Sequence, residues 1–482
     1  MEKIKKFLFI NTSTKQTVIK NTFWLFFGEI IGRILKLVIV VFSTRKLGVE
    51  GWGLFSYAMA FISLFFILGD FGINTFITKE MSKDNNNKHK YLATSIIIRL
   101  FMIAVFCSTA LLLAPNLGKI KLGFGIVFIF TLFFVSESLR EIAMSINRSL
   151  EKMEVEGFSK ILINLSITVF GLILLINNVD PISLAMAYMI GSIISTIYIV
   201  WSIRKELKGI EWKFSKENWK VIYQFSWPIV IMSFFGFLFS LDTIMLGQMK
   251  SAVDVGLYTM AQRLISVFSI IPGFIGASLF PILSRNENDN NKLGYIFEKI
   301  MTIILALGIP ITIIGVFFSK EIILLIVGPA YIAGASVLGV LMISILASFP
   351  NIFLTNLIFS KNLQKIFITA TISGVLLNIL LNFWLIPKYG ALGAAISTTI
   401  AELLIMVTNW KRLKKIIPFS VIPKLGKIAL SNMVMLIIII VLHLIGLNFI
   451  IITFIAIVTY ILILNMLEES NFKEIYSLVK NH

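Results

Sequence analysis

The chain has 482 residues, of which 57% are hydrophobic and 14% are charged, and it carries a formal net charge of +18. A soluble protein of this length has too little interior to hide so much apolar surface, so the composition excludes a soluble class and leaves a polytopic membrane protein. The single cysteine, Cys107, excludes a disulfide framework and a cysteine metal site. The positive charge lies mainly between apolar runs, where Lys and Arg set membrane orientation, so it does not indicate a nucleic-acid partner.

Fourteen apolar runs predict fourteen membrane-spanning helices, each close to the ~20 residues that cross a bilayer. In chain order the predicted spans cover residues 21–44, 52–78, 91–114, 122–146, 158–177, 182–203, 221–248, 254–280, 296–318, 331–358, 365–386, 391–410, 424–446 and 448–467. We therefore expect an all-α polytopic membrane protein. The longest loops, 204–220 and 410–424, follow the sixth and twelfth spans and indicate sets of six, six and two helices.

An internal repeat supports this division. The segment VEGWGLFSYA (49–58) matches VDVGLYTMA (253–261) through a Gly-Leu-aromatic core, and each copy begins the second span of its set. A parallel repeat of this kind predicts two six-helix lobes related by a pseudo-two-fold axis along the membrane normal. The predicted domains are an N-lobe (1–210), a C-lobe (211–415) and a final helix pair with a cytoplasmic tail (416–482).

Most of the 43 Lys and Arg residues fall in segments on one side of the predicted spans. Because cytoplasmic segments carry the excess of Lys and Arg, this asymmetry predicts that both termini are cytoplasmic. The two long basic loops are expected to lie on the anionic inner leaflet.

The first span, FFGEIIGRILKLVIVVF, contains three charged residues, Glu29, Arg33 and Lys36. At about 100° per residue they fall within a sector of about 60°, and charged residues inside a membrane normally face a bundle interior or a water-filled cavity. Gly28 and Gly32 predict close approach of another helix beside this stripe. The alternative is structural: Glu29 pairs with Arg33 at i, i+4, and Lys36 reaches outward to the interface.

Other spans also contain polar residues that are expected to face the bundle interior. Asp70, in the second span, is interpreted as either a counter-ion for Arg33 or Lys36 or an ion-coupling group. The remaining candidates are Asn74 in the second span, Asp242 in the seventh, Gln262 and Arg263 in the eighth, and Asn378 and Asn382 in the eleventh.

Two further groups of charges are interpreted as ordinary features of helix ends. Glu137, Arg140, Glu141 and Arg148 lie at the cytoplasmic end of the fourth span at helical spacing, which is typical of a solvated, salt-bridged helix end. Arg99 lies in the cytoplasmic half of the third span and is expected to reach the interface.

The sequence contains no GxxxxGK[ST] phosphate-binding loop, no HExxH motif and no cysteine–histidine cluster. No predicted outer loop is long enough to hold a glycosyl-transfer site. We therefore expect a transporter rather than an enzyme, with no metal or other cofactor. Coupling to Na⁺, to H⁺ or to the membrane potential is left open.

Three segments carry a family resemblance: GDFGINTFITKEMSK (69–83), VDVGLYTMAQRL (253–264) and YGALGAAISTTIAELL (389–404). With the two six-helix lobes and two extra helices, they resemble the Wzx-type polysaccharide biosynthesis flippases of the multidrug/oligosaccharidyl-lipid/polysaccharide (MOP) exporter superfamily, over essentially the whole chain. The resemblance implies a monomeric protein of the cell membrane. It would move an isoprenoid-(pyro)phosphate-linked oligosaccharide from the cytoplasmic to the outer leaflet by alternating access through a cation-lined cavity.

The resemblance also suggests roles for the candidate residues, because arginine binds the oxygens of a pyrophosphate bidentately. The expected phosphate contacts are Arg33, Lys36 and Arg263. The expected contacts to sugar hydroxyls are Gln262, Asn378 and Asn382. The residues expected to be structural or ion-coupling are Glu29, Asp70, Asn74 and Asp242.

Three alternatives remain at this point. A cation-coupled drug antiporter of the same superfamily would use Asp70 and Asp242 for Na⁺ or H⁺. A flippase for the peptidoglycan-precursor lipid has the same helix count. A membrane glycan polymerase or ligase would require acidic or histidine chemistry in an outer loop, which the sequence lacks. Besides the substrate and membrane lipids, a glycan polymerase or glycosyltransferases are the expected partners.

Overall fold

The computed structural model describes residues 11–67, 71–83, 88–114, 119–208, 212–238 and 241–467, together with residues 9, 69 and 210. Every regular element in this described part is a helix. The chain divides into two compact units, Met1–Gly256 and Leu257–His482. The division falls inside one helix, α10 (Ala252–Phe268), and the domain boundaries expected near residues 210 and 415 stay predictions.

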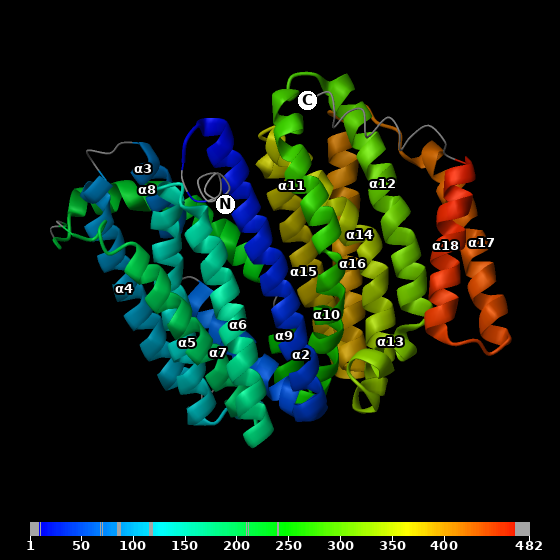
Figure 1. Ribbon diagram of the computed structural model, residues 1–482, viewed down its shortest axis with the longest axis horizontal. Helices are drawn as coiled ribbons and strands as arrows, with labels where there is room; N and C mark the ends of the chain where they lie inside the picture. Colours follow the sequence, from blue (N-terminus) through cyan, green and yellow to red (C-terminus); the bar gives the residue numbers. More distant parts are fainter. Residues whose placement is uncertain are drawn as a thin grey trace. The chain divides into compact units, whose positions relative to one another are not determined.

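The first unit is built from eight described helices and the first turn of α10 (Figure 1). They are α2 (Thr14–Ile67), α3 (Ile73–Lys83), α4 (Lys88–Leu113), α5 (Phe124–Ser149), α6 (Met153–Asn177), α7 (Pro181–Ser202), α8 (Lys216–Leu238) and α9 (Leu241–Met249). Helix α2 contains the first predicted span and most of the second, joined through a kink at Gly48 (φ 66°, ψ −175°). A positive φ costs glycine little because it has no Cβ.

The second predicted span, residues 52–78, is not continuous. Helix α2 ends at Ile67 and α3 begins at Ile73, and the turn between them holds Phe71 at φ 47° and Gly72 at φ 68°. A Cβ at Gly72 would lie 3.1 Å from the backbone oxygen of Ser226 in α8, so both the left-handed backbone and the close neighbour favour glycine there. The break lies next to Asp70, which is outside the described residues.

Glycines bring α2 and α6 into close contact at the centre of the first unit. A Cβ on Gly28 would lie 2.6 Å from the backbone oxygen of Gly157, and a Cβ on Gly32 would lie 3.0 Å from Asn164 Nδ2. The Thr168 hydroxyl of α6 donates to the Leu35 carbonyl of α2 at 3.0 Å. This is the small-residue packing that the glycines of the first span predicted.

This contact predicts that a Gly-to-Ala substitution changes stability differently at two positions of the first unit. We expect Gly28→Ala to destabilise the first unit by about 1–3 kcal/mol, because backbone atoms of α6 must move to admit the methyl group. The matched control is Gly125→Ala in α5, where nothing lies within 4 Å of the new Cβ. We expect it to be neutral or to stabilise by up to about 1 kcal/mol through helix propensity. Thermal unfolding in detergent measures both, and equal midpoints for the two variants would contradict the close contact.

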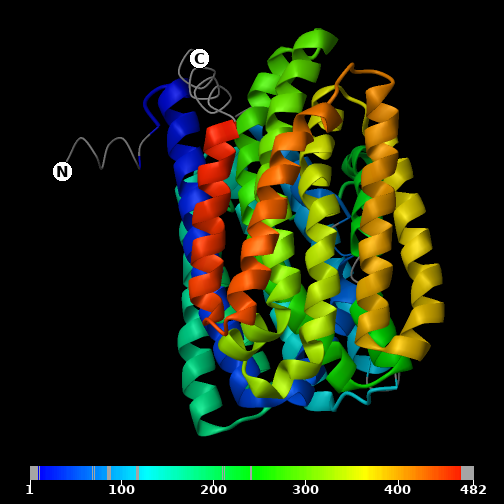
Figure 2. The same cartoon turned by 90° about the vertical axis from the view of Figure 1, so that its right-hand side faces the viewer.

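The second unit contains the rest of α10 and ten further described helical elements after it. They are α11 (Ile270–Arg285), α12 (Asn290–Phe317), α13 (Ser319–Ile326), η1 (Pro329–Gly334), α14 (Ala335–Ser360), α15 (Gln364–Tyr389), α16 (Ala391–Lys414), η2 (Ile422–Lys424), α17 (Leu425–Leu444) and α18 (Phe449–Leu467). Helix α14 packs against both α12 and α16, and α16 also packs along α15. Helices α17 and α18 form a hairpin and lie side by side in both views (Figures 1 and 2). Ile428, Met435 and Ile439 of α17 belong to the buried apolar cluster at this hairpin.

Within the described residues, nine helices are long and apolar enough to cross a membrane. Several match predicted spans closely: α7 covers 181–202 against a predicted 182–203, and α15 covers 364–389 against 365–386. Many large apolar side chains on these helices are exposed, including Leu380 at 67% and Phe454 at 69%. In lipid such a surface is favourable because the backbone is satisfied inside each helix. The chain is therefore a multi-pass membrane protein, and the predicted all-α class is confirmed.

Candidate functional site

The charged stripe of the first span lies on α2. Arg33 Nε donates to Glu29 Oε1 at 2.7 Å, as their i, i+4 spacing predicted. Both side chains stay open, at 44% exposed for Arg33 and 37% for Glu29. Lys36 is half-buried one turn further along. The pair explains how α2 carries these charges, yet it leaves nearly half of the Arg33 side chain exposed.

The pair on α2 continues into a chain of charges across two more helices. Lys160 Nζ on α6 lies 3.5 Å from Glu29 Oε2 and 3.4 Å from Glu156 Oε1. Glu156 in turn accepts two hydrogen bonds from Arg148 of α5, from Nε at 2.6 Å and from Nη2 at 2.7 Å. We call Arg33, Glu29, Lys160, Glu156 and Arg148 the ion-pair ladder.

The ladder has a cation at each end and a net charge of +1. Its innermost acid, Glu156, is 1% exposed, whereas the side chain of Arg148 is 40% exposed. Lys160, at 28%, lies between the two acids. The ionised form of a carboxylate as buried as Glu156 is stable only because two cations contact it. The arrangement therefore fixes the cations by their acids and leaves positive charge at the surface.

The sequence produces this ladder through helix periodicity and close packing together. Glu29 and Arg33 share one face of α2, and Glu156 and Lys160 share one face of α6, because each pair is four residues apart. The contact of Gly28 with Gly157 lies beside these faces and brings the two helices close enough for Lys160 to reach Glu29.

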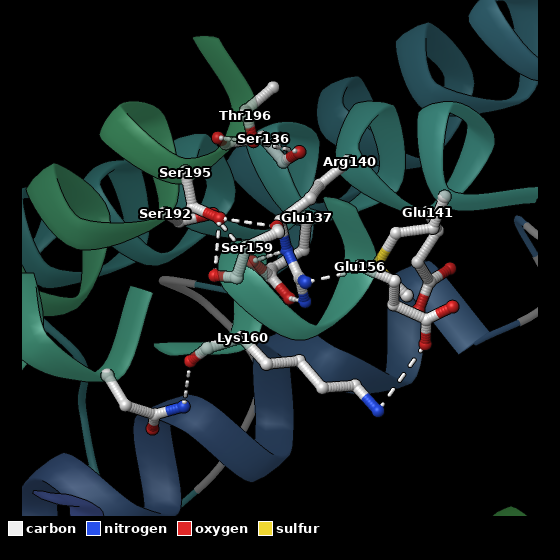
Figure 3. A network of polar contacts seen from close by, with 12 residues as sticks. Ser136, Glu137, Arg140, Glu141, Glu156, Ser159, Lys160, Ser192, Ser195 and Thr196 are labelled. Atoms are coloured by element: carbon white, nitrogen blue, oxygen red, sulfur yellow. Dashed lines mark hydrogen bonds and ion pairs between the residues drawn. The ribbon is translucent and has the colours of Figure 1, made fainter. Parts of the chain in front are cut away.

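A second polar network lies beside the ladder and is shown in Figure 3. Arg140 donates to Glu137 through Nε at 2.9 Å and Nη2 at 2.5 Å, and Ser192 of α7 donates to Glu137 Oε1 at 2.7 Å. The hydroxyls of Ser159 and Ser195 join α6 to α7 at 2.8 Å. The side chains of Arg140 and Glu137 are only 11% and 19% exposed. The interpretation as a solvated helix end is therefore wrong for Glu137 and Arg140, which lie against Ser192 of α7. Glu141 and Arg148, at 47% and 40% exposed, are exposed and ion-paired as predicted.

Arg99 is also placed differently from the expectation. It is 1% exposed, and its Nη2 lies 3.3 Å from Glu141 Oε2 of α5. The same carboxylate oxygen accepts from Asn74 Nδ2 of α3 at 3.3 Å. The prediction that Arg99 reaches the interface is wrong, because Glu141 draws the guanidinium into a contact between α3, α4 and α5.

The remaining candidates in the first unit do not join the ladder through any contact described here. Asn74 belongs to the Arg99–Glu141 cluster. Asp242 lies in the first turn of α9 and is 2% exposed. Asp70 lies outside the described residues, so its suggested pairing with Arg33 or Lys36 stays a prediction.

In the second unit, the candidates occupy two separate helices. Gln262 and Arg263 are both exposed on α10. Asn378 and Asn382 are buried on α15, at 4% and 0% exposed, and Asn382 Nδ2 donates to Asn378 Oδ1 at 3.1 Å. Their assignment to phosphate and sugar contacts stays a prediction.

Sequence reasoning did not single out Lys160 and Glu156. A signal was present, because an i, i+4 Glu–Lys pair begins the apolar run of the fifth span in EGFSKILINL. In the part of the chain that the structure describes, no group of three or more His, Cys, Asp or Glu side chains is placed to hold a metal ion. In the first unit, the exposed cations Arg33 and Arg148 are each paired with an acid of the ladder.

Solved structures define the class of this fold. The lipid II flippase MurJ in an inward closed conformation matches with a TM-score of 0.78, at 20% identity, over 94% of this chain and 99% of that one. An inward-facing multidrug resistance MATE family transporter of the MOP superfamily matches with a TM-score of 0.59, at 12% identity, over 86% and 96%. The chain therefore has the fold of a MOP-superfamily transporter, which confirms the predicted fold class.

Sequence comparisons define the family. The model described as polysaccharide biosynthesis protein matches residues 18–287, and a MatE model matches residues 228–384. The chain belongs to the polysaccharide biosynthesis protein family of these transporters, as its motifs predicted.

Named relatives agree with this placement. A probable low-salt glycan biosynthesis flippase, Agl15 of Haloferax volcanii, is 22% identical over 79% of this chain and 80% of its own length. A putative O-antigen transporter of Shigella flexneri is 23% identical over 80% and 96%. The capsular polysaccharide biosynthesis protein CapF of Staphylococcus aureus is 22% identical over 83% and 100%. The first of these relatives is named as a flippase and the second as a transporter, which agrees with the prediction of a transporter rather than an enzyme.

Proposed function

We propose that this protein is a flippase that moves an isoprenoid-(pyro)phosphate-linked oligosaccharide from the inner to the outer leaflet by alternating access, for surface glycan assembly. The family match and the names of the relatives support a polysaccharide-related, lipid-linked substrate. A pyrophosphate is the anionic part of such a substrate, so a membrane-embedded cation is needed to bring it through an apolar layer.

The observation that carries the proposal is the state of Arg33. Only Nε of its guanidinium is bonded, to Glu29, and the part of the chain described here offers no partner to its two terminal nitrogens. Two parallel N–H donors on a fixed guanidinium match the geometry of two phosphate oxygens. Arg148 and Lys160 extend the positive charge along the same ladder toward the end of α5.

The rest of the proposal concerns surroundings and energy. We place the protein in the cytoplasmic membrane with both termini cytoplasmic, because Lys and Arg are concentrated on one side of the spans. We propose further that it acts as a monomer. The membrane potential acts directly on an anionic headgroup, and Na⁺ or H⁺ coupling through a buried acid such as Asp242 is the alternative energy source. A glycan polymerase or glycosyltransferases would act before or after the flipping step.

A second candidate is a cation-coupled drug antiporter, favoured by the MatE match over residues 228–384. Such a protein would bind cationic drugs at acidic side chains. The ladder in the first unit ends in cations on both sides, and this favours an anionic substrate.

Deletion of the gene in its native host distinguishes the two candidates. We expect surface glycan to be lost and a lipid-linked precursor to accumulate, accessible only from the cytoplasmic face, with both changes reversed by the intact gene. Drug susceptibility should not change. Normal glycan together with increased susceptibility to cationic drugs would overturn the flippase in favour of the antiporter.

A further inference from the structure

The end of α16 carries a basic cluster that the proposed transport function does not use. Lys411, Arg412 and Lys414 lie in the last turn of this helix, and Lys415 is its C-terminal cap. With Trp410 they line a cavity of about 460 Å³. All four cationic side chains are exposed. We define these five residues as the α16 basic pocket.

The cations of this pocket are not neutralised by the protein. In the described part of the chain, the side chains of Lys411, Lys414 and Lys415 make no ion pair. The guanidinium of Arg412 donates through Nη1 to the Thr369 hydroxyl of α15, a neutral group. Glu298 of α12 accepts the backbone N–H of Ser420, in the segment that follows the pocket, at 2.5 Å. Four cationic residues therefore line one hollow, and no residue in the described part of the chain forms an ion pair with them.

The segment after the pocket is packed tightly and fixes the backbone at the end of α16. Phe419 packs between Trp410, edge-to-face with 5.1 Å between ring centroids, and Phe297 of α12, tilted by 51° at 4.5 Å. Ile417 is 0% exposed and Val421 is 1% exposed. A Cβ on Gly294 would overlap the carbonyl oxygen of Pro418, so α12 and this segment are in backbone contact. Because the backbone on both sides is fixed, an anion would bind here with little ordering cost.

The position along the helix indicates what kind of anion reaches the pocket. Helix α16 is one of the nine candidate spans, and the cluster lies at its end, where lipid headgroups meet an embedded helix. The pocket combines the Trp410 ring and the methylene stems of three lysines with a cationic rim. This combination suits an amphiphile, with a phosphate for the rim and an apolar body for the floor. We propose that the α16 basic pocket binds the phosphate headgroup of an anionic membrane lipid.

The competing explanation is that these charges only set membrane orientation. Orientation depends on the number of Lys and Arg residues in a segment and requires neither a cavity nor a rigid backbone. The two explanations differ in what happens when the same number of charges is removed from another basic segment. Lys205 and Lys208, which are exposed after α7, supply that control.

The test titrates the purified full-length chain in detergent with phosphatidylglycerol and counts bound lipid by native mass spectrometry. Phosphatidylcholine serves as the neutral reference. We expect Lys414→Gln/Lys415→Gln to weaken phosphatidylglycerol binding about thirtyfold, since each lysine near a phosphate contributes about fivefold. Lys414→Arg/Lys415→Arg should retain binding, and Lys205→Gln/Lys208→Gln should change it less than about twofold.

Two results would overturn the proposal. If the Lys414/Lys415 variant and the Lys205/Lys208 control lose phosphatidylglycerol binding equally, the lipid responds only to general surface charge. Displacement of phosphatidylglycerol by inorganic phosphate or glycerol 3-phosphate at equal concentration would identify a site for free anions rather than for a lipid. Neither result depends on glycan transport, so the pocket and the proposed function fail independently.

Discussion

Replacing Arg33 with glutamine is expected to abolish most transport while leaving the protein folded. The side chain is 44% exposed and pairs with an exposed carboxylate, so its loss costs at most about 1 kcal/mol of stability. A charge-assisted contact to a phosphate is stronger, about 1.5–3 kcal/mol, which corresponds to a loss of roughly tenfold to hundredfold in flux. Surface glycan in a deletion strain that carries the variant measures the effect, with membrane-inserted protein quantified in the same cells.

The fork geometry of arginine provides a graded control for this result. Arg33→Lys keeps the charge and loses the parallel donors, so we expect glycan between the levels of the intact protein and Arg33→Gln. Arg204→Gln removes the same charge from the exposed turn after α7, where the guanidinium stacks on Trp201 at 3.9 Å, and should leave glycan unchanged. Full glycan with Arg33→Gln would exclude Arg33 as the phosphate contact without excluding the flippase, which the gene deletion tests separately.

Much of the fold follows from hydropathy because a membrane allows few solutions. A span needs about 20 apolar residues and must satisfy its own backbone, so the apolar runs predicted α7 and α15 to within a few residues. The break between α2 and α3 was not predictable in this way. It requires Phe71 at φ 47° and Gly72 packed against Ser226, and hydropathy contains no information on either.

The candidate site was predictable only within single helices. The contact of Arg33 with Glu29 follows from a spacing of four residues. The contact of Glu29 with Lys160 joins residues 131 positions apart and depends on which helices pack together. Arg99 shows the same limit, because its place near a helix end suggested exposure, whereas Glu141 on a neighbouring helix holds it inside. The sequence thus located the charges inside spans, but their partners required the tertiary structure.

Removing Glu156 is expected to have the largest effect on stability. Its carboxylate is 1% exposed and contacts both Arg148 and Lys160, so Glu156→Leu would leave two cations against an apolar side chain. Breaking a buried ion pair costs about 3–5 kcal/mol, and we expect about 3 here because Arg148 is 40% exposed and can be partly hydrated. The unfolding midpoint in detergent should fall by several degrees. Glu80→Gln, which breaks an exposed pair with Lys83 on α3, should change the midpoint little.

A double variant separates the loss of the pair from the loss of the side chain. When both members of a buried ion pair are replaced by apolar residues of similar size, stability is often retained, because neither charge is left without a partner. Lys160 would still contact Glu29 in Arg148→Leu/Glu156→Leu. We therefore expect this variant to recover at least half of the stability lost in Glu156→Leu. If instead the double variant loses as much stability as Arg148→Leu and Glu156→Leu lose together, Glu156 stabilises the first unit through its packing rather than its charge. Arg148 is then not held by the ladder.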